Sequence, residues 1–79
     1  MAINKIMVVD DSPTERFFLE GLLSKQGYQV VTVENGEEAI TKAKQEKPDL
    51  ILMDVVMPGL NGFQATRAIS KDDETRHIP

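Results

Sequence analysis

The segment IMVVDD, residues 6–11, decides the fold of this chain, because four consecutive apolar residues end in two acidic ones. An apolar run of this length predicts a β-strand that is buried on both faces. The segment LILMD, residues 50–54, repeats the pattern with a single terminal acid. Between the two, the β-branched segment QVVTV, residues 29–33, predicts another short strand. We therefore expect three strands, of which the first and third carry acids at their carboxyl ends.

Each expected strand is followed by a segment with the features of a helix. We expect helices over residues 13 to about 26, 35–47 and 61 to about 70, and glycine or proline follows the first two. The first two helices are expected to begin with a capping box, in which a Ser or Asn cap is followed three residues later by a Glu that bonds back to it. The expected caps are Ser12, Asn35 and Asn61, and the box glutamates are Glu15 and Glu38.

Apolar residues at helical spacing predict the face that each helix buries. The alternation of strands and helices predicts an α/β fold with parallel strands, right-handed crossovers and helices on both faces of the sheet. The residues expected to face the core are Phe18, Leu19, Leu22 and Leu23 in the first helix, Ala39, Ile40 and Ala43 in the second, and Phe63, Thr66 and Ile69 in the third.

Composition excludes several classes of function. The 79 residues fit one small domain. The absence of cysteine excludes disulfides and thiolate metal sites and suits a reducing compartment. A net charge of −4 disfavours nucleic acid as a partner and favours cations. No apolar segment approaches the ~20 residues that span a bilayer, and no secretion signal is recognisable, so we expect a cytoplasmic protein without a membrane partner.

Asp10, Asp11 and Asp54 follow the first and third strands directly. Ligands of open parallel sheets bind beyond the carboxyl ends of the strands, where the strand order reverses. If the first strand lies between the other two, the three acids meet at that edge. Asp10 and Asp11 alone would need no function beyond complementing a helix dipole. Because three neighbouring carboxylates repel one another, their coincidence indicates a divalent-cation site, and an oxygen-only donor set favours Mg²⁺ over zinc.

Asp54 is our candidate nucleophile, because it stands alone at its strand end and a loop with free backbone groups follows it. A positioned carboxylate can attack phosphorus and form an aspartyl phosphate. Phosphohydrolases with this chemistry are the enzymatic alternative, but they typically carry Asp-x-Asp after the first strand, whereas the acids here are adjacent. Arg16, near the expected site, is interpreted as a solvated surface residue.

The segments VVDDS, residues 8–12, and LMDVVMPGLNG, residues 52–62, resemble the signature of the receiver domain of two-component response regulators. Residues 57–67 look most like the single-domain regulators of type IV pilus twitching motility. The resemblance implies a flavodoxin-like, doubly wound parallel sheet with strand order 2-1-3. It also implies a signalling switch that receives phosphate from a sensor histidine kinase and then engages a downstream output protein.

The resemblance implies a role for each matching residue. Asp54 corresponds to the phosphorylated aspartate, Asp11 to the direct Mg²⁺ ligand, and Asp10 to the acidic neighbour that holds the metal through water. Val56 corresponds to the residue whose backbone carbonyl completes the metal site and whose N–H faces the phosphoryl group. A polar side chain at this position can place the hydrolytic water, so the apolar Val56 predicts slow loss of phosphate.

Residues 1–79 match only the front of the family domain. The two further strand–helix units of a receiver, with a Ser or Thr hydroxyl, a Lys and a switching aromatic residue, have no counterpart in the sequence. We therefore expect an incomplete receiver domain whose third strand, residues 50–53, has an exposed apolar edge. The alternative to a phosphoacceptor module is thus a fragment that does not switch and that self-associates or swaps strands through this edge.

Overall fold

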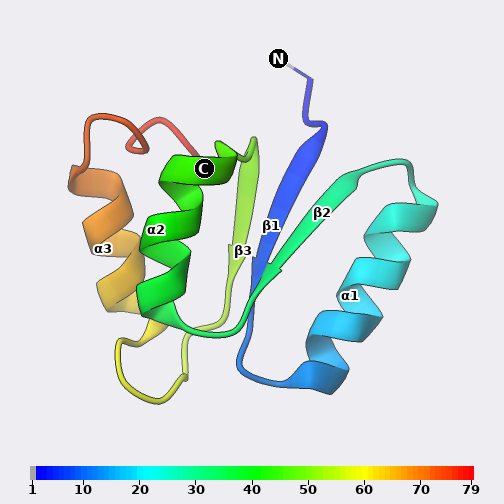
Figure 1. The fold of residues 1–79 in the computed structure, drawn as a ribbon, viewed down its shortest axis with the longest axis horizontal. Helices are drawn as coiled ribbons and strands as arrows, with labels where there is room; N and C mark the ends of the chain where they lie inside the picture. Colours follow the sequence, from blue (N-terminus) through cyan, green and yellow to red (C-terminus); the bar gives the residue numbers. More distant parts are fainter. Residues whose placement is uncertain (1) are drawn as a thin grey trace.

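The computed structural model describes residues 2–79, in which three strands alternate with three helices (Figure 1). Each boundary lies within about one residue of the expected one. None of the described helices is both long enough and apolar enough to cross a bilayer. The elements are β1 (Lys5–Val9), α1 (Pro13–Lys25), β2 (Gln29–Val33), α2 (Gly36–Glu46), β3 (Leu50–Met53) and α3 (Gly62–Lys71).

The three strands form one parallel sheet in the order β2-β1-β3, which confirms the expected order (Figure 1). Ile6 of β1 pairs with Val30 of β2 on one side and with Leu50 of β3 on the other. Ile6 to Val9 are all buried because β1 is the central strand. Its carboxyl end therefore lies between those of its two neighbours, and this places the acids that follow it.

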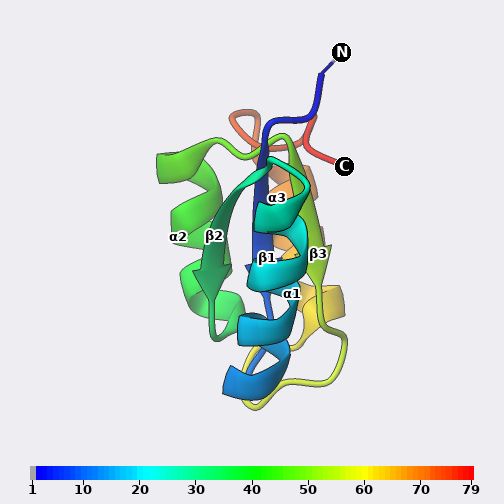
Figure 2. The ribbon, with the colours of Figure 1, turned by 90° about the vertical axis from the view of Figure 1, so that its right-hand side faces the viewer.

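The two faces of the sheet are covered unequally. Helix α1 packs on one face, and α2 and α3 pack side by side on the other (Figures 1 and 2). The main apolar core lies between the sheet and the α2–α3 pair. Met7 and Met57 belong to this core, and Met57 brings the loop after β3 into it. The remaining buried members are Val9, Val33, Ala39, Ala43 and Ile69.

The caps of all three helices are confirmed, but the capping boxes differ from the expectation. At α1 the Ser12 hydroxyl accepts a hydrogen bond from the Glu15 N–H at 3.3 Å. The Ser12 N–H donates to Asp10 Oδ1 at 2.9 Å, so it is not available to the Glu15 side chain. At α2 only the bond from the Glu38 N–H to the Asn35 side chain is present in the described structure. The complete box is at α3, between Asn61 and Gln64.

The predicted buried faces were correct for α2 and partly wrong for α1 and α3. Phe18 is 63% exposed and Leu22 48% exposed, because α1 has no neighbouring helix on its face of the described structure. Leu19 and Leu23 are half-buried against the sheet. In α3, contact with α2 brings Ala65 and Ile69 inward, and it leaves Phe63 and Thr66 exposed, contrary to the expectation.

The end of the chain returns to the outer edge of β3. The Thr75 hydroxyl is buried and donates to the Ile69 carbonyl at 2.7 Å, which ties the segment after α3 to that helix. The Pro79 carbonyl then accepts a hydrogen bond from the Ile51 N–H at 3.0 Å. This contact satisfies one backbone donor of β3, while Leu52 remains 36% exposed.

Candidate functional site

The ends of β1 and β3 bring the candidate acids together. Val9 and Met53 are partners in the parallel ladder, so the residues that follow them leave the sheet side by side. The Asp54 N–H donates to the Val9 carbonyl at 2.9 Å and continues the pairing by one residue. On the other side, the Asp10 N–H donates to the Val33 carbonyl of β2 at 3.0 Å. Backbone hydrogen bonds to the sheet therefore fix the positions of Asp10 and Asp54.

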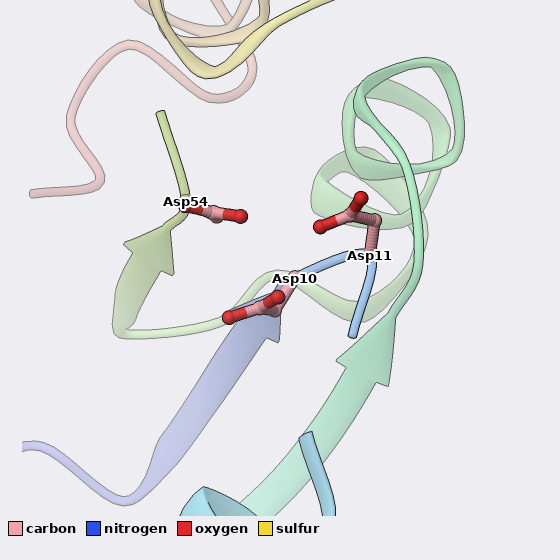
Figure 3. Close-up of side chains that lie close together, drawn as sticks. All are labelled: Asp10, Asp11 and Asp54. Atoms are coloured by element: carbon pink, nitrogen blue, oxygen red, sulfur yellow. The ribbon is translucent and has the colours of Figure 1, made fainter. Parts of the chain in front are cut away.

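The structure brings together the three acids that the sequence indicated (Figure 3). One carboxylate oxygen from each of Asp10, Asp11 and Asp54 lies within 4.8 Å of the other two. Asp10 and Asp54 are half-buried, and Asp11 is exposed. In Figure 3 the carboxylates of Asp11 and Asp54 point toward each other beyond the ends of β1 and β3. All three oxygens are therefore within reach of one cation.

The loop between β1 and α1 is held by two further contacts to Asp10. One carboxylate oxygen of Asp10 accepts the Ser12 N–H, which leaves its other oxygen free of this bond. The Arg16 guanidinium donates to the Asp10 carbonyl at 2.7 Å. The interpretation of Arg16 as a solvated surface residue was therefore wrong, because its side chain is half-buried and turns back to the loop that carries the acids.

The electrostatics of the cluster suit a hard cation. Within residues 2–79, none of the three carboxylates forms an ion pair with a lysine or arginine side chain. Three carboxylates at this separation repel one another unless a proton or a cation compensates them. Carboxylate oxygens with open positions for water and phosphate oxygens are the ligand set that Mg²⁺ prefers. The chemistry of the cluster thus fits the predicted Mg²⁺.

The loop between β3 and α3 is exposed at its start and anchored further on. Val55 is 45% exposed and Val56 80% exposed, whereas Met57 is buried in the core. The Gly62 N–H donates to the Val55 carbonyl at 3.0 Å and closes the loop. Val56 lies two residues beyond Asp54 with its side chain in solvent, and its part in metal and phosphoryl binding stays a prediction.

Glu37 was not among the candidate residues from the sequence, yet its side chain contacts this loop in the structure. Its side chain accepts a hydrogen bond from the Leu60 N–H at 3.3 Å. An acid in the first turn of a helix is usually explained by the helix dipole, and the local sequence gives it no other role. The contact depends on how α2 packs beside the loop, which the local sequence does not reveal.

Comparison with known proteins agrees with the fold and identifies a family. The response regulator receiver domain family matches residues 6–79. The chain is 59% identical to PilH of Pseudomonas aeruginosa over 75 residues, which are 95% of this chain and 62% of PilH. It is 38% identical to the polar-differentiation response regulator DivK of Brucella anthropi, over 94% of this chain and 60% of DivK.

Solved structures show the same fold. The N-terminal domain of a response regulator receiver protein from Methanoculleus marisnigri superimposes with a TM-score of 0.94 at 35% identity, over 99% of this chain and 63% of that one. The receiver domain of a sensor histidine kinase from Pseudomonas aeruginosa, with a magnesium ion coordinated in its active-site cleft, gives a TM-score of 0.91 at 36% identity, over 99% of this chain and 64% of that one. The chain thus spans about three fifths of the length of these relatives. From the family match, the relatives and the shared fold, we conclude that this chain belongs to the response regulator receiver domain family.

Proposed function

We propose that this chain is a phosphoacceptor module of a two-component phosphorelay, in which Asp54 receives a phosphoryl group from a histidine kinase with the help of Mg²⁺. The observation that carries the proposal is the meeting of three carboxylates within 4.8 Å at the carboxyl edge of the sheet. Membership in the receiver domain family and the magnesium described in a related receiver support it.

Three acids and one backbone group would bind the metal and carry out the phosphoryl transfer at the site. We assign Asp11 and Asp54 as direct ligands of Mg²⁺, Asp10 as a ligand through water, and the Val56 carbonyl as a further ligand. The bound cation would neutralise the oxygens of the transferred group and so lower the barrier to attack by an anion. Asp54 is the nucleophile because the ladder to Val9 fixes its backbone while its carboxylate stays accessible.

The transfer consumes the acceptor. An oxygen of the Asp54 carboxylate forms a bond to phosphorus while the bond from phosphorus to the donor nitrogen breaks, and the donor histidine keeps the electron pair. The Val56 N–H would donate to a phosphoryl oxygen. Receiver domains are signalling modules, so we propose that the chain does not turn over a substrate. Its product is a phosphorylated surface for a downstream output protein.

The relatives and the composition support a proposal for the cellular setting. The 59% identity to PilH supports a regulator of the type IV pilus twitching-motility kind. We propose a cytoplasmic protein whose partners are a sensor histidine kinase and an output protein. A net charge of −4 argues against direct contact with nucleic acid.

Intact mass spectrometry after incubation with acetyl phosphate and Mg²⁺ tests the proposal. We expect one phosphate adduct on the wild-type chain and none on Asp54→Asn, which keeps the size of the side chain but removes the nucleophile. Omission of Mg²⁺ should also abolish the adduct. An adduct that survives Asp54→Asn would place the nucleophile elsewhere.

The second candidate behaviour is self-association through β3. We propose that residues 6–79 form the front part of a receiver domain, since the chain spans about three fifths of its relatives. The outer position of β3 in the described sheet supports an accessible edge, although the Pro79 carbonyl covers one backbone donor of the strand. An edge strand of this kind can pair with a second copy.

A further inference from the structure

We infer that Glu37 is a positioning residue for the phosphoacceptor site, because its carboxylate holds the loop that follows Asp54. The inference rests on the proposed function for its chemical consequence. The contact itself rests on the geometry of α2 and of the loop between β3 and α3, and it can be measured without any phosphodonor.

The Glu37 carboxylate lies directly over the backbone of Gly59 and Leu60. Glu37 Oε2 accepts the Leu60 N–H at 3.3 Å across 23 residues of sequence. A Cβ on Gly59 would lie 3.3 Å from the same oxygen, and Gly59 has a φ of 72°, which favours glycine. The glycine therefore makes room for the carboxylate and also provides the turn that presents the Leu60 N–H to it.

The start of α2 also touches the loop through its own backbone. A Cβ built on Gly36 would overlap the Leu60 carbonyl oxygen and lie 3.1 Å from the Leu60 Cβ. The Asn35 side chain caps the helix at this point and accepts the Glu38 N–H at 2.8 Å. The first turn of α2 is thus a fixed support. Leu60 is held against it by the hydrogen bond to Glu37 and by the close approach of Gly36.

A displacement of Leu60 reaches Asp54 because the loop between β3 and α3 is short and closed. Gly62, two residues after Leu60, packs so tightly on the backbone of Asp54 that a Cβ would overlap the Asp54 carbonyl oxygen. The same hypothetical Cβ would lie 2.8 Å from the Val55 Cα. Met57 fixes the middle of the loop in the core. With Met57 fixed, a shift of Leu60 acts through Gly62, whose close packing holds the backbone of Asp54 and Val55.

Charge alone could mimic this effect, since removal of any acid near a cluster of acids changes how that cluster binds a cation. The chain supplies two controls. Glu38 is the next residue of the same helix turn, carries the same charge and has an exposed side chain. Glu37→Gln removes the charge but keeps an amide oxygen that can accept the Leu60 N–H.

The experiment compares the wild-type chain with Glu37→Ala, Glu37→Gln and Glu38→Ala. Hydrogen exchange of the Leu60 amide is measured by NMR without Mg²⁺ or phosphodonor. The rate of phosphate uptake from acetyl phosphate is then measured at saturating Mg²⁺ by intact mass. We expect Glu37→Ala to lose the protection of Leu60 and to react more slowly, on the order of fivefold, and we expect Glu37→Gln and Glu38→Ala to stay close to the wild type in both measurements.

Equal rates of phosphate uptake for Glu37→Ala and Glu38→Ala would overturn the inference. Loss of the contact with Leu60 would then have no effect beyond the removal of one charge. Unchanged Leu60 exchange in Glu37→Ala would overturn it as well, because the hydrogen bond would not order the loop. A wild-type chain that takes up no phosphate would defeat the proposed function and with it the chemical consequence of Glu37. The exchange data from the same samples would still show whether Glu37 holds Leu60.

Discussion

At the scale of single residues, we expect the exposed side chain of Val56 to set the lifetime of the proposed phosphoryl group on Asp54. It is 80% exposed and lies two residues after Asp54, so a polar group there has open access to water near the phosphoryl group. We expect Val56→Asn to shorten the lifetime of phosphorylated Asp54 several-fold, because an amide can place the attacking water. The measurement is the decay of the phosphate adduct by intact mass after removal of the donor.

Val55→Asn is the matched control for Val56→Asn. Val55 is 45% exposed and neighbours both Asp54 and Val56, and an amide there tests whether any polar side chain in the loop accelerates hydrolysis. We expect a lifetime close to that of the wild type. A Val56→Asn variant that decays no faster than Val55→Asn would count against a special role for position 56.

Two glycines are expected to respond to the same substitution with opposite signs. A Cβ on Gly62 would overlap the Asp54 carbonyl oxygen, and backbone atoms cannot move aside cheaply. Gly62→Ala should therefore lower the free energy of unfolding by about 2 kcal/mol or more. Gly21 lies inside α1 with nothing within 4 Å of a Cβ, so Gly21→Ala should raise it by about 0.5–1 kcal/mol. Denaturant unfolding measures both, and a destabilised Gly21→Ala would contradict this account.

The sequence could predict the acids of the site, but not the residues that hold its loops. Asp10 and Asp54 directly follow apolar runs. The local sequence is therefore enough to place them at the ends of parallel strands, where ligands bind. The contact of Glu37 with Leu60 joins segments 23 residues apart and depends on how α2 packs beside the loop. The contact of Arg16 with the Asp10 carbonyl likewise depends on the path of the loop between β1 and α1.

At the scale of elements, Asp49 connects the starts of β3 and β1 at the end of the sheet away from the acids. Its Oδ2 accepts the N–H groups of Lys5 and Asn4, each at 2.9 Å. The hydrogen bond from the Lys5 backbone, followed by that from Asn4, lowers the pKa of Asp49 below its ordinary value. The folded chain therefore binds a proton at Asp49 less readily than the unfolded chain does.

A lowered pKa in the folded state makes this stabilisation dependent on pH. It is complete above the ordinary aspartate pKa of about 4 and is lost as the pH falls through the lower pKa of the folded state. We expect Asp49→Asn to destabilise the chain at neutral pH, and we expect the difference from the wild type to shrink in acid. Urea unfolding at a series of pH values measures this.

Asp73→Asn controls for acid unfolding in general, since the Asp73 side chain is 92% exposed. The free energy of unfolding of Asp73→Asn should stay close to that of the wild type at every pH. If the loss of unfolding free energy in Asp49→Asn stays constant or grows as the pH falls, the role given to the hydrogen bonds that Asp49 accepts from the backbone is refuted.

The limits of the helices could be predicted more accurately than their buried faces. Caps depend on residues within one turn of the helix, so Ser12, Asn35 and Asn61 were identified correctly. Burial depends on what lies opposite. Phe18 and Phe63 have the spacing of core residues, yet both are exposed, because α1 lacks a neighbouring helix in the described structure and α3 turns toward α2.

At the scale of the whole molecule, the unequal covering of the sheet should govern association. Within residues 2–79, one face carries α2, α3 and the main core, whereas the other carries only α1, with Phe17 80% exposed. The described structure thus has two apolar surfaces, the outer edge of β3 and the outer side of α1. Exposed apolar surface of this kind favours contact between copies.

We expect the edge of β3 to be the surface that pairs, because strand pairing adds backbone hydrogen bonds to apolar contact, whereas α1 offers side chains alone. Leu52→Lys places a charge on that edge strand and should lower the mass measured by light scattering toward the 8.8 kDa monomer at concentrations where the wild type associates. Phe17→Lys removes a more exposed apolar side chain from α1 and should leave the mass unchanged. If Phe17→Lys dissociates the chain and Leu52→Lys does not, association runs through the helix. A wild type that is monomeric at every concentration would contradict association through either surface.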